Sequence, residues 1–578
     1  MTHKGAGVRI WCVAAVLAVI VIAAFWPCVN NAFLNWDDEA NFVQNSHFRG
    51  LGVANIKWAW ITSLLGVYQP VAWMAFEAQY CVFGLDPRGY HLVSILLHAA
   101  NTVLLFLLAV LLLRRYSRDY YSQSPLICLT GAALATGLYA VHPLRVEPVA
   151  WASCQPYLVC VFFYLLAIGA YLLAFPSESR PKWRWLAASF LFTVLALFSK
   201  ALAVSVPFVL LILDVYPLRR IGWKERGGWF GRNTIRVWLE KLPYFAAAAI
   251  FMLIATSVRR TNIGTTDIFR AAYVVCFYLV KSVAPSHLTI IYVLPHADFA
   301  LYAKFAASIL AIAGISAGAY LLRRRVPGLL AAWLVYLVTV APTTIFVPIT
   351  TQVAADRYCH LPTMAFAILA AATPFLQLYR KHGGAAGVAA LTGAGVGCMG
   401  LLLVLTAAQC RTWRTSHDLW SHAYRQGSPG MSRVHNFFGL VLSGRGMLGD
   451  AAREFHVAID LDPNFGEPYN NLGAALGMDG RLDEAAREFA EAIRVDPYCY
   501  GAYNNLGTVY AKRGDVRRAL GLYAKSLSIE PDYDGAADNL NELIKSNQLP
   551  APLVGPAKAI SDNPRDKAAH QALAAAIQ

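Results

Sequence analysis

The sequence predicts an all-α protein in two parts, a helical domain that crosses a membrane many times and a smaller α-solenoid that follows it. Of the 578 residues, 57% are hydrophobic and 14% are charged, and the mean hydropathy is +0.46. This composition is too apolar for a soluble chain of that length and indicates a polytopic membrane protein. After residue 409 the sequence becomes charged and alanine-rich and repeats with a fixed period, which predicts the solenoid.

Apolar runs about as long as a bilayer is thick recur along the first part of the chain, and we expect eleven of them to span the membrane. Lys4 and Arg9 precede the first run and no small-x-small cleavage site lies before Trp26, so we expect that run to remain as a signal anchor. The eleven runs are 8–28, 90–113, 126–141, 156–175, 184–199, 201–217, 240–257, 301–322, 328–347, 361–379 and 385–409.

The basic residues assign the sides of the membrane. The formal net charge is +15, but Lys and Arg cluster in short loops between apolar runs, which is the positive-inside pattern and not a nucleic-acid patch. These loops are at 114–118, 180–184, 219–236, 323–325 and 380–381. They alternate along the chain, so all are cytoplasmic if the amino terminus is. An odd number of spans places the two ends of the membrane domain on opposite sides. We therefore expect a multi-pass protein of the bacterial inner membrane with the repeats on the non-cytoplasmic side.

Two stretches do not fit the list of spans. Residues 270–285 are apolar, but counting them as a span would place the arginines at 323–325 outside, so we expect a re-entrant or interfacial helix there. Residues 51–83 hold many Trp and Tyr and few charges, which predicts short helices at the membrane surface.

The carboxyl-terminal part carries tetratricopeptide repeats, in which two helices pack through a small residue and a proline closes each unit. We expect a membrane domain over 1–410, a connector over 411–428, about three repeats and a capping helix over 429–545, and a linker with a weak terminal helix over 546–578. The residues that recur 34 apart are Pro429, Pro463, Pro497 and Pro531; Gly439, Gly473 and Gly507; Ala451, Ala485 and Ala519; and Phe455, Phe489 and Tyr523.

Three consecutive acids, Asp37, Asp38 and Glu39, directly follow the first predicted span. The simpler interpretation is a solvated loop, because surface carboxylates are common. However, acids contribute little to membrane orientation, and adjacent carboxylates raise one another's pKa. Such a pair suits a general base or a cation ligand, and the sequence leaves both uses of Asp37 and Asp38 open. No other metal site is expected.

Further charged residues lie on the predicted non-cytoplasmic side. Each has a structural alternative, such as a proline-punctuated turn, a snorkelling lysine or a simple Asp-Arg pair. Together they could bind a phosphate through charge-assisted hydrogen bonds. The candidates are His142, Arg145, Glu147, Lys200, Arg260 and Arg357.

No Walker loop, zinc motif, Gly-x-Ser-x-Gly or dinucleotide fingerprint appears, which argues against nucleotide-driven transport. A transporter would also need polar groups at mid-membrane, and Asp214 is the only acid deep within an apolar run.

The order of these motifs resembles the transmembrane and tetratricopeptide-repeat O-mannosyltransferases and their bacterial relatives in the GT-C glycosyltransferase superfamily. The segments that carry the resemblance are NWDDE (35–39), HPLRVEPVAW (142–151), FSKALAVSVPFVLLILD (198–214), DRYCHLP (356–362), RTWRTSHDLW (411–420) and the repeats. The resemblance implies a GT-C-like membrane fold, a polyprenyl-phosphate sugar as donor and a protein hydroxyl as acceptor. It matches Asp38 to the catalytic acid, with Asp37 as the alternative base.

The same resemblance matches His142 and Glu147 to the second-loop motif, Lys200 to the family's lysine after the fifth span and Arg357 to the arginine before the tyrosine. One departure stands beside Lys200, where Ala201 replaces the family's acid. We therefore expect an inverting transfer of mannose or another hexose to a Ser or Thr of a protein held by the repeats. The alternative is a non-catalytic scaffold in which the membrane domain anchors a repeat array for envelope assembly, although a single span would serve that purpose.

Overall fold

The computed structural model shows a helical protein that divides into two compact units. It describes residues 3–116, 124–176, 181–222, 228–258, 266–292, 299–345, 352–370, 385–426, 431–546 and 548–577. The first unit comprises Met1–Ala32 and His47–Arg414, and the second comprises Phe33–Ser46 and Thr415–Gln578. In the described part of the chain, the β pairing consists of one isolated bridge between Tyr292 and Ala354. The predicted all-α class is confirmed.

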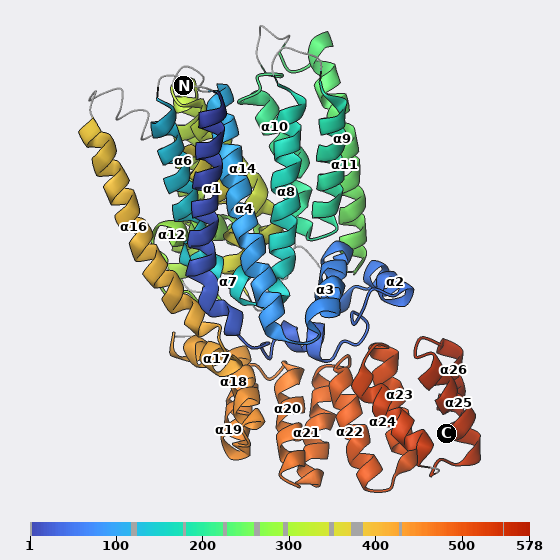
Figure 1. The fold of residues 1–578 in the computed structure, drawn as a ribbon. Coiled ribbons are helices and arrows are strands. Elements are labelled where there is room, and N and C mark those ends of the chain that lie inside the picture. The colour runs from blue at the N-terminus through green and yellow to red at the C-terminus, as the bar shows by residue number, and fades with distance from the viewer. Residues whose placement is uncertain are drawn as a thin grey trace. The chain divides into compact units, whose positions relative to one another are not determined.

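The first unit is a bundle of long helices, which Figure 1 shows running side by side. α4 packs against both α1 and α8, and α8 packs against α9. The helices of this unit are α1 (His3–Phe25), α2 (Val53–Ile61), α3 (Pro70–Phe83), α4 (Pro87–Tyr116), α6 (Pro125–Ala140), α7 (Val146–Ala150), α8 (Gln155–Ala174), α9 (Trp183–Leu197), α10 (Val206–Val215), α11 (Arg232–Val258), α12 (Thr266–Val283), α13 (Phe299–Leu321), α14 (Pro327–Ile345) and α16 (Ala385–Thr412).

Fewer helices than predicted are long and apolar enough to cross a membrane. Among the described residues seven qualify, or up to eight if the bent pair Pro125–Ala140 and Pro143–Ala150, with its 62° bend, forms one span. Two expected spans, 184–199 and 201–217, correspond to shorter apolar helices at Trp183–Leu197 and Ala201–Val215. The expected span 361–379 lies partly outside the described residues. The count of eleven, and the sidedness that depends on its being odd, stay predictions.

The two stretches that sequence reasoning set apart form helices that are not among these candidate spans. Residues 270–285 fall largely in α12, whose 18 residues include Asp267, Arg270 and Lys281. Residues 51–83 form α2 and α3, of 9 and 14 residues, which are too short to cross a bilayer.

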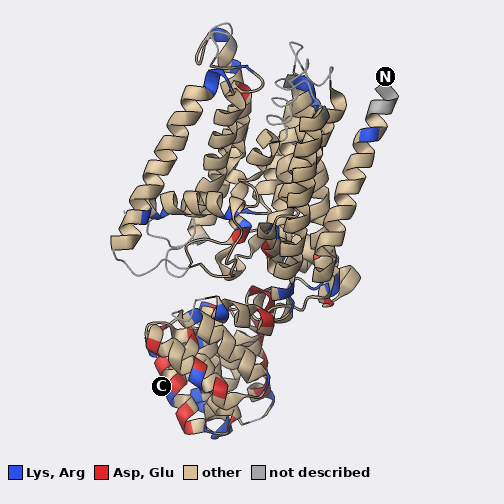
Figure 2. Ribbon diagram, turned by 90° about the vertical axis from the view of Figure 1, so that its left-hand side faces the viewer, with Lys and Arg blue, Asp and Glu red and all other residues tan. Residues whose placement is uncertain are grey.

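The charges of the bundle are distributed as the positive-inside pattern predicts. Figure 2 shows many of its Lys and Arg at the end of the bundle where α1 begins. Arg114 and Arg115 end α4, and Arg323 and Arg324 follow α13 in a short 3-10 turn. Basic groups at one end of a helical bundle are typical of a membrane protein with that end on the cytoplasmic side.

The second unit is a repeat array. Helices α18, α20, α22 and α24 begin 34 residues apart, and each packs against the helix that follows it. The helices of this unit are α17 (Ser416–Arg425), α18 (Ser432–Gly444), α19 (Leu448–Leu461), α20 (Gly466–Met478), α21 (Leu482–Val495), α22 (Tyr500–Lys512), α23 (Val516–Ile529), α24 (Asp534–Lys545), α25 (Ala551–Asp562) and α26 (Lys567–Ile577).

The recurring residues lie where the repeat pattern predicts. A Cβ added at Gly473 would lie 2.8 Å from the Phe489 ring, so only glycine allows the two helices to approach so closely. Gly439 and Gly507 meet the rings of the next helix in the same way. Ala451, Ala485 and Ala519 are fully buried at these crossings. Pro463, Pro497 and Pro531 each lie two residues beyond the end of a helix, and Pro429 lies outside the described residues.

The structure corrects the predicted end of the array. Within the region 546–578, predicted as a linker with a weak terminal helix, α25 pairs with α24 as a fourth repeat, and α26 packs against both α25 and α23 as the cap. The fourth pair has Asn541 in place of the glycine and Ala557 in place of the aromatic residue. A larger residue on one helix is thus matched by a smaller one on the other, which keeps the volume of the crossing while hiding the sequence signature.

The boundary between the units also differs from the expected one near residue 410. The expected connector, 411–428, contains α17, and Thr415 caps this helix because its Oγ1 accepts a hydrogen bond from the backbone N–H of Asp418 at 3.2 Å. More unexpectedly, Phe33–Ser46 belongs to the repeat unit and not to the membrane bundle.

Candidate functional site

The acid triplet differs in exposure from one residue to the next. Asp38 is fully buried, Asp37 is half-buried and Glu39 is exposed. The Oδ2 of Asp38 accepts a hydrogen bond from the backbone N–H of Leu34 at 2.9 Å. Glu39 begins a short π-helical turn, and its Oε1 accepts a bond from Gln44 at 3.3 Å. Of the three, Asp38 is therefore the carboxylate that is withdrawn from water and held by a backbone hydrogen bond. Its use as a base stays a prediction.

The first unit brings Glu147 and Arg357 together, although they are far apart in the sequence. Glu147 lies in α7, which the bend after α6 turns aside, and Arg357 lies in a 3-10 turn at Asp356–Cys359. The guanidinium of Arg357 forms an ion pair with Glu147 Oε1, and the backbone N–H of Arg357 donates to Oε2 at 2.8 Å. Both side chains are nearly buried. Glu147 therefore fixes both the backbone and the charged group of Arg357.

Arg145 is buried beside this pair but has only neutral partners. It donates to Thr363 Oγ1 at 2.8 Å and contacts His360 Nδ1 at 3.3 Å. Its guanidinium carbon lies 4.4 Å from the centroid of the Tyr139 ring. Among the described residues it forms no ion pair, and its Nε has no hydrogen-bond partner. A buried guanidinium without a counter-charge is costly, which makes Arg145 an anion-binding candidate.

His142 has a mainly local role in the structure. Its Nδ1 accepts a hydrogen bond from the backbone N–H of Leu144 at 3.3 Å and so caps the 3-10 turn Pro143–Arg145. The prolines that follow keep this loop from continuing α6 as a straight helix. His142 thus shapes the turn that carries Arg145 and Glu147.

Asp356 adds a second carboxyl group to the cluster. Its Oδ1 accepts a hydrogen bond from the hydroxyl of Tyr292 at 2.8 Å. Burial raises the pKa of Asp356 well above its ordinary value, and the nearby charge of Glu147 raises it further. Asp356 therefore holds a proton more readily than an ordinary aspartate does.

Lys200 is connected to Arg357 by two aromatic rings. Its Nζ donates to Gln69 Oε1 at 2.9 Å and lies 4.8 Å from the centroid of the Tyr157 ring. The Tyr157 and Tyr358 rings lie 6.0 Å apart, and the guanidinium carbon of Arg357 lies 4.8 Å from the Tyr358 ring. The two cations therefore flank the two aromatic rings, whose faces attract positive charge.

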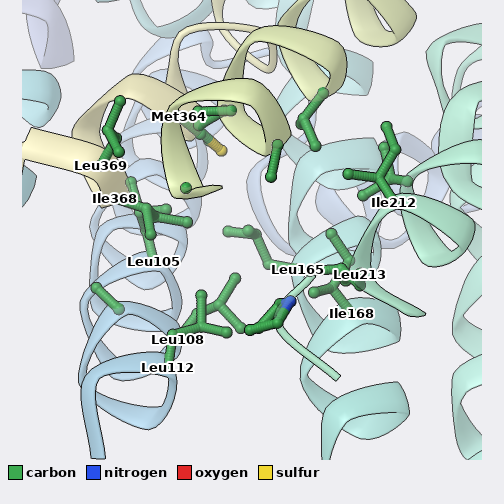
Figure 3. A pocket seen from close by; sticks show the side chains of 18 of the residues that line it. Leu105, Leu108, Leu112, Leu165, Ile168, Ile212, Leu213, Met364, Ile368 and Leu369 are labelled. Carbon is green, nitrogen blue, oxygen red and sulfur yellow. The ribbon is translucent and has the colours of Figure 1, made fainter. Parts of the chain in front are cut away.

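An apolar cavity of about 180 Å³ lies within the bundle next to this cluster. Figure 3 shows Leu105, Leu108 and Leu112 of α4 facing Leu165, Ile168 and Ile212 of α8 and α10 across it. Met364, which also lines the cavity, follows directly after the Thr363 that bonds Arg145. A hydrocarbon chain would fit these walls, with a polar head placed among the cations.

The structure thus unites most, but not all, of the predicted site residues. His142, Arg145, Glu147, Lys200 and Arg357 belong to one region of the first unit, whereas the acid triplet belongs to the second unit. Arg260 lies outside the described residues. Within the described residues, no group of three or more His, Cys, Asp or Glu could hold a metal ion. Whether Asp37 and Asp38 bind a cation stays a prediction.

Several partners were not singled out from sequence. Tyr139, Tyr157 and Gln69 lie in or beside apolar runs, where a single polar residue gives no periodic signal. Thr363 could have been suspected, because it follows closely after the charged segment 356–360.

Comparison with known proteins supports the same picture. A model of the tetratricopeptide repeat matches residues 501–529. The chain is 26% identical over 160 residues to Protein O-mannosyl-transferase TMTC4 of Mus musculus, covering 27% of this chain and 22% of that protein. It is 30% identical over 193 residues to Protein O-mannosyl-transferase Tmtc1 of Drosophila melanogaster, covering 32% and 21%. The alignments span about a fifth of these relatives. The predicted resemblance is confirmed.

Solved structures match at low similarity. The crystal structure of MamA is 20% identical with a TM-score of 0.20, covering 28% of this chain and 86% of that chain. The crystal structure of YrrB, described as a TPR protein with an unusual peptide-binding site, is 24% identical with a TM-score of 0.20, covering 28% and 83%.

Proposed function

We propose, from the similarity to proteins named as O-mannosyl-transferases, that this chain is a membrane glycosyltransferase. It would move a hexose, such as mannose, from a polyprenyl phosphate to a Ser or Thr hydroxyl of a protein on the non-cytoplasmic side. The observation that carries this proposal is Arg145, a buried guanidinium that has no ion-pair partner among the described residues and stands beside an apolar cavity. A lipid phosphate would supply the missing counter-charge, and its hydrocarbon would fill the cavity.

The reaction needs a base and a stabilised leaving group. Asp38 would take the proton of the acceptor hydroxyl as its oxygen attacks the anomeric carbon. The bond from that carbon to the phosphate oxygen would break, and the electron pair would leave on the lipid phosphate. Because the attack and departure occur on opposite faces, the anomeric configuration would invert. Arg145, Arg357 and Lys200 would stabilise the charge that grows on the phosphate.

The repeats supply a surface suited to a polypeptide acceptor. The side-chain amide of Asn471 donates to Asn436 at 2.8 Å, that of Asn505 to Asn470 at 2.9 Å and that of Asn539 to Asn504 at 2.8 Å. These asparagines form a ladder along the first helices of four successive repeats. Asn436 and Asn504 are buried, whereas Asn470, Asn471, Asn505 and Asn539 are half-buried. The half-buried amides would offer donors and acceptors to a peptide backbone, so the ladder would hold an extended acceptor with little preference for its side chains.

Sugar transfer tests the proposal directly. Purified full-length protein in lipid nanodiscs would be incubated with labelled polyprenyl-phosphate mannose and an unfolded Ser- and Thr-rich polypeptide. We expect label on the polypeptide, and we expect Asp38→Asn to abolish it without loss of folding. If Asp37→Asn is inactive while Asp38→Asn is active, the base is Asp37 and not Asp38. No transfer from any polyprenyl-phosphate sugar would overturn the proposal in favour of the scaffold.

Donor binding can be measured separately. Arg145→Met should weaken the binding of unlabelled polyprenyl phosphate by about 10- to 100-fold, because a hydrogen bond to a charged group contributes about 1.5–3 kcal/mol. Arg323→Met is the matched control, since Arg323 lies in the 3-10 turn after α13 and bonds only the Tyr320 carbonyl among the described residues. Equal affinities for the two variants would contradict the assignment of Arg145.

A further inference from the structure

The loop that carries the acids is built into the repeat unit, although more than 350 residues of chain separate it from the first repeat. Nothing in the sequence indicates this pairing, because the loop follows a membrane span directly. Within the second unit, contacts of Asn35 and Trp36 with Ser416, Trp420 and Phe437 attach the loop to the helices that open the array.

Asn35 makes the polar attachment. Its backbone N–H donates to Ser416 Oγ at 2.9 Å, and its Oδ1 accepts a hydrogen bond from the indole N–H of Trp420 at 2.8 Å. Both partners belong to α17, whose first turn is set by the cap at Thr415. Two hydrogen bonds from one residue to one helix fix its position as well as its orientation.

Trp36 makes the apolar attachment. The rings of Trp420 and Phe437 are stacked with centroids 4.5 Å apart and 7° between their planes. The Trp36 ring lies 5.5 Å from Trp420 and 6.1 Å from Phe437, so it completes a three-ring cluster. Trp420 is fully buried there. Aromatic clusters of this kind add directional contacts to the area they bury.

The loop itself is short and internally braced. The Phe33 and Phe42 rings stack at 4.9 Å across it, and the bond from Leu34 to Asp38 closes the turn between them. Asp38 is thus only two residues from the anchored Trp36. On the other side of Asp38, Glu39 begins the short helical turn Glu39–Val43 that completes the loop.

We propose that the repeat unit positions the catalytic base: the three-ring cluster of Trp36, Trp420 and Phe437, together with Asn35, holds Asp38 in its working position. This inference rests on the proposed function. Trp36, Trp420 and Asn35 are positioning residues, since they act on the reaction through Asp38. The unit that would bind the acceptor then also carries the base, so both are held by the same unit. The donor site belongs to the other unit.

Two variants of one residue separate the contributions. Trp420→Ala removes the ring and the indole N–H, whereas Trp420→Phe keeps a ring for stacking and removes only the N–H. For Trp420→Ala we expect kcat to fall about 10- to 100-fold with KM for the lipid donor unchanged, because a small misplacement of a reacting group has costs of this size. Trp420→Phe should recover most of the rate.

Hydrogen exchange of the full-length protein gives a readout that does not depend on activity. Backbone amides of residues 33–46 should lose protection in Trp420→Ala and regain it in Trp420→Phe. Tyr510→Ala is the matched control, since Tyr510 packs in the array core and is not part of the cluster. It should leave protection of 33–46 unchanged.

The outcomes are distinct. Unchanged protection in Trp420→Ala, unchanged kcat, or a rise in donor KM that accounts for the whole effect would each overturn the positioning role. A wild-type protein that transfers no sugar would overturn the proposed function instead, while loss of protection in Trp420→Ala would still support the attachment of the loop to the array.

Discussion

Removing the charge of Glu147 should destabilise the first unit strongly, because Arg357 would then be buried without its counter-charge. The exposed fractions of the two side chains are 2% for Glu147 and 10% for Arg357, so water cannot replace the lost partner. Breaking a buried ion pair from one side costs about 3–5 kcal/mol. Glu147→Gln keeps one acceptor for the backbone N–H of Arg357, so the decrease in the free energy of unfolding measures mainly the loss of the charge.

The double variant Glu147→Gln/Arg357→Met sharpens this test. With both charges removed, no unpaired ion is left, and we expect the free energy of unfolding to return to within about 1–2 kcal/mol of the wild type. Glu484→Gln is the control, because Glu484 pairs with Arg481 on the exposed surface of the array, where water replaces the lost partner and the free energy of unfolding should hardly change.

The measurement is denaturant unfolding of the purified full-length protein in detergent micelles, followed by tryptophan fluorescence. If the free energy of unfolding of Glu147→Gln lies within about 1 kcal/mol of the wild-type value, the pair is not a buried ion pair in solution and the reasoning is wrong. A double variant as unstable as Glu147→Gln alone would also refute it, since the loss would then come from packing and not from charge.

Three further changes test other parts of the structure. Gly473→Ala should destabilise the array by about 1–3 kcal/mol, because the new Cβ would lie 2.8 Å from the Phe489 ring. Gly477→Ala should be tolerated, because the nearest neighbour of its new Cβ lies at 3.8 Å. Hydrogen exchange of the repeats distinguishes the two variants. Glu77 is buried in α3, neither of its oxygens has a partner among the described residues, and burial raises its pKa to about 7. The stability that its neutral form provides is full below pH about 4.5 and is lost as the pH rises through about 7, so Glu77→Gln should remove this pH dependence from the melting temperature. Ala332→Phe would fill part of the cavity and should weaken binding of polyprenyl phosphate, and unchanged affinity would exclude the cavity as the lipid site.

The two-part fold could be predicted because its signals are local and repetitive. Apolar runs and basic loops marked the membrane helices, and the 34-residue period marked the repeats down to the glycines at their helix crossings. The fourth repeat could not be predicted, since Asn541 and Ala557 exchange the sizes of the two contacting residues. A prediction that searches for the glycine and the aromatic residue separately does not find a repeat in which the two sizes are exchanged.

The candidate site was predicted in its residue types but not in its arrangement. Arg145, Glu147 and Arg357 were each expected to take part, yet only the fold shows that Glu147 neutralises Arg357 and leaves Arg145 with neutral partners. Spacing along a chain says nothing about which of two arginines a carboxylate reaches across more than 200 residues.

By itself, the sequence determined that this is a many-helix membrane protein with a repeat array, because hydrophobicity and period are properties of neighbouring residues. Only the tertiary structure decided that the acid loop at Asp38 is part of that array. The hydrogen bonds of Asn35 and the ring contacts of Trp36 form with α17 and α18, and contacts between segments this far apart exist only once the chain has folded.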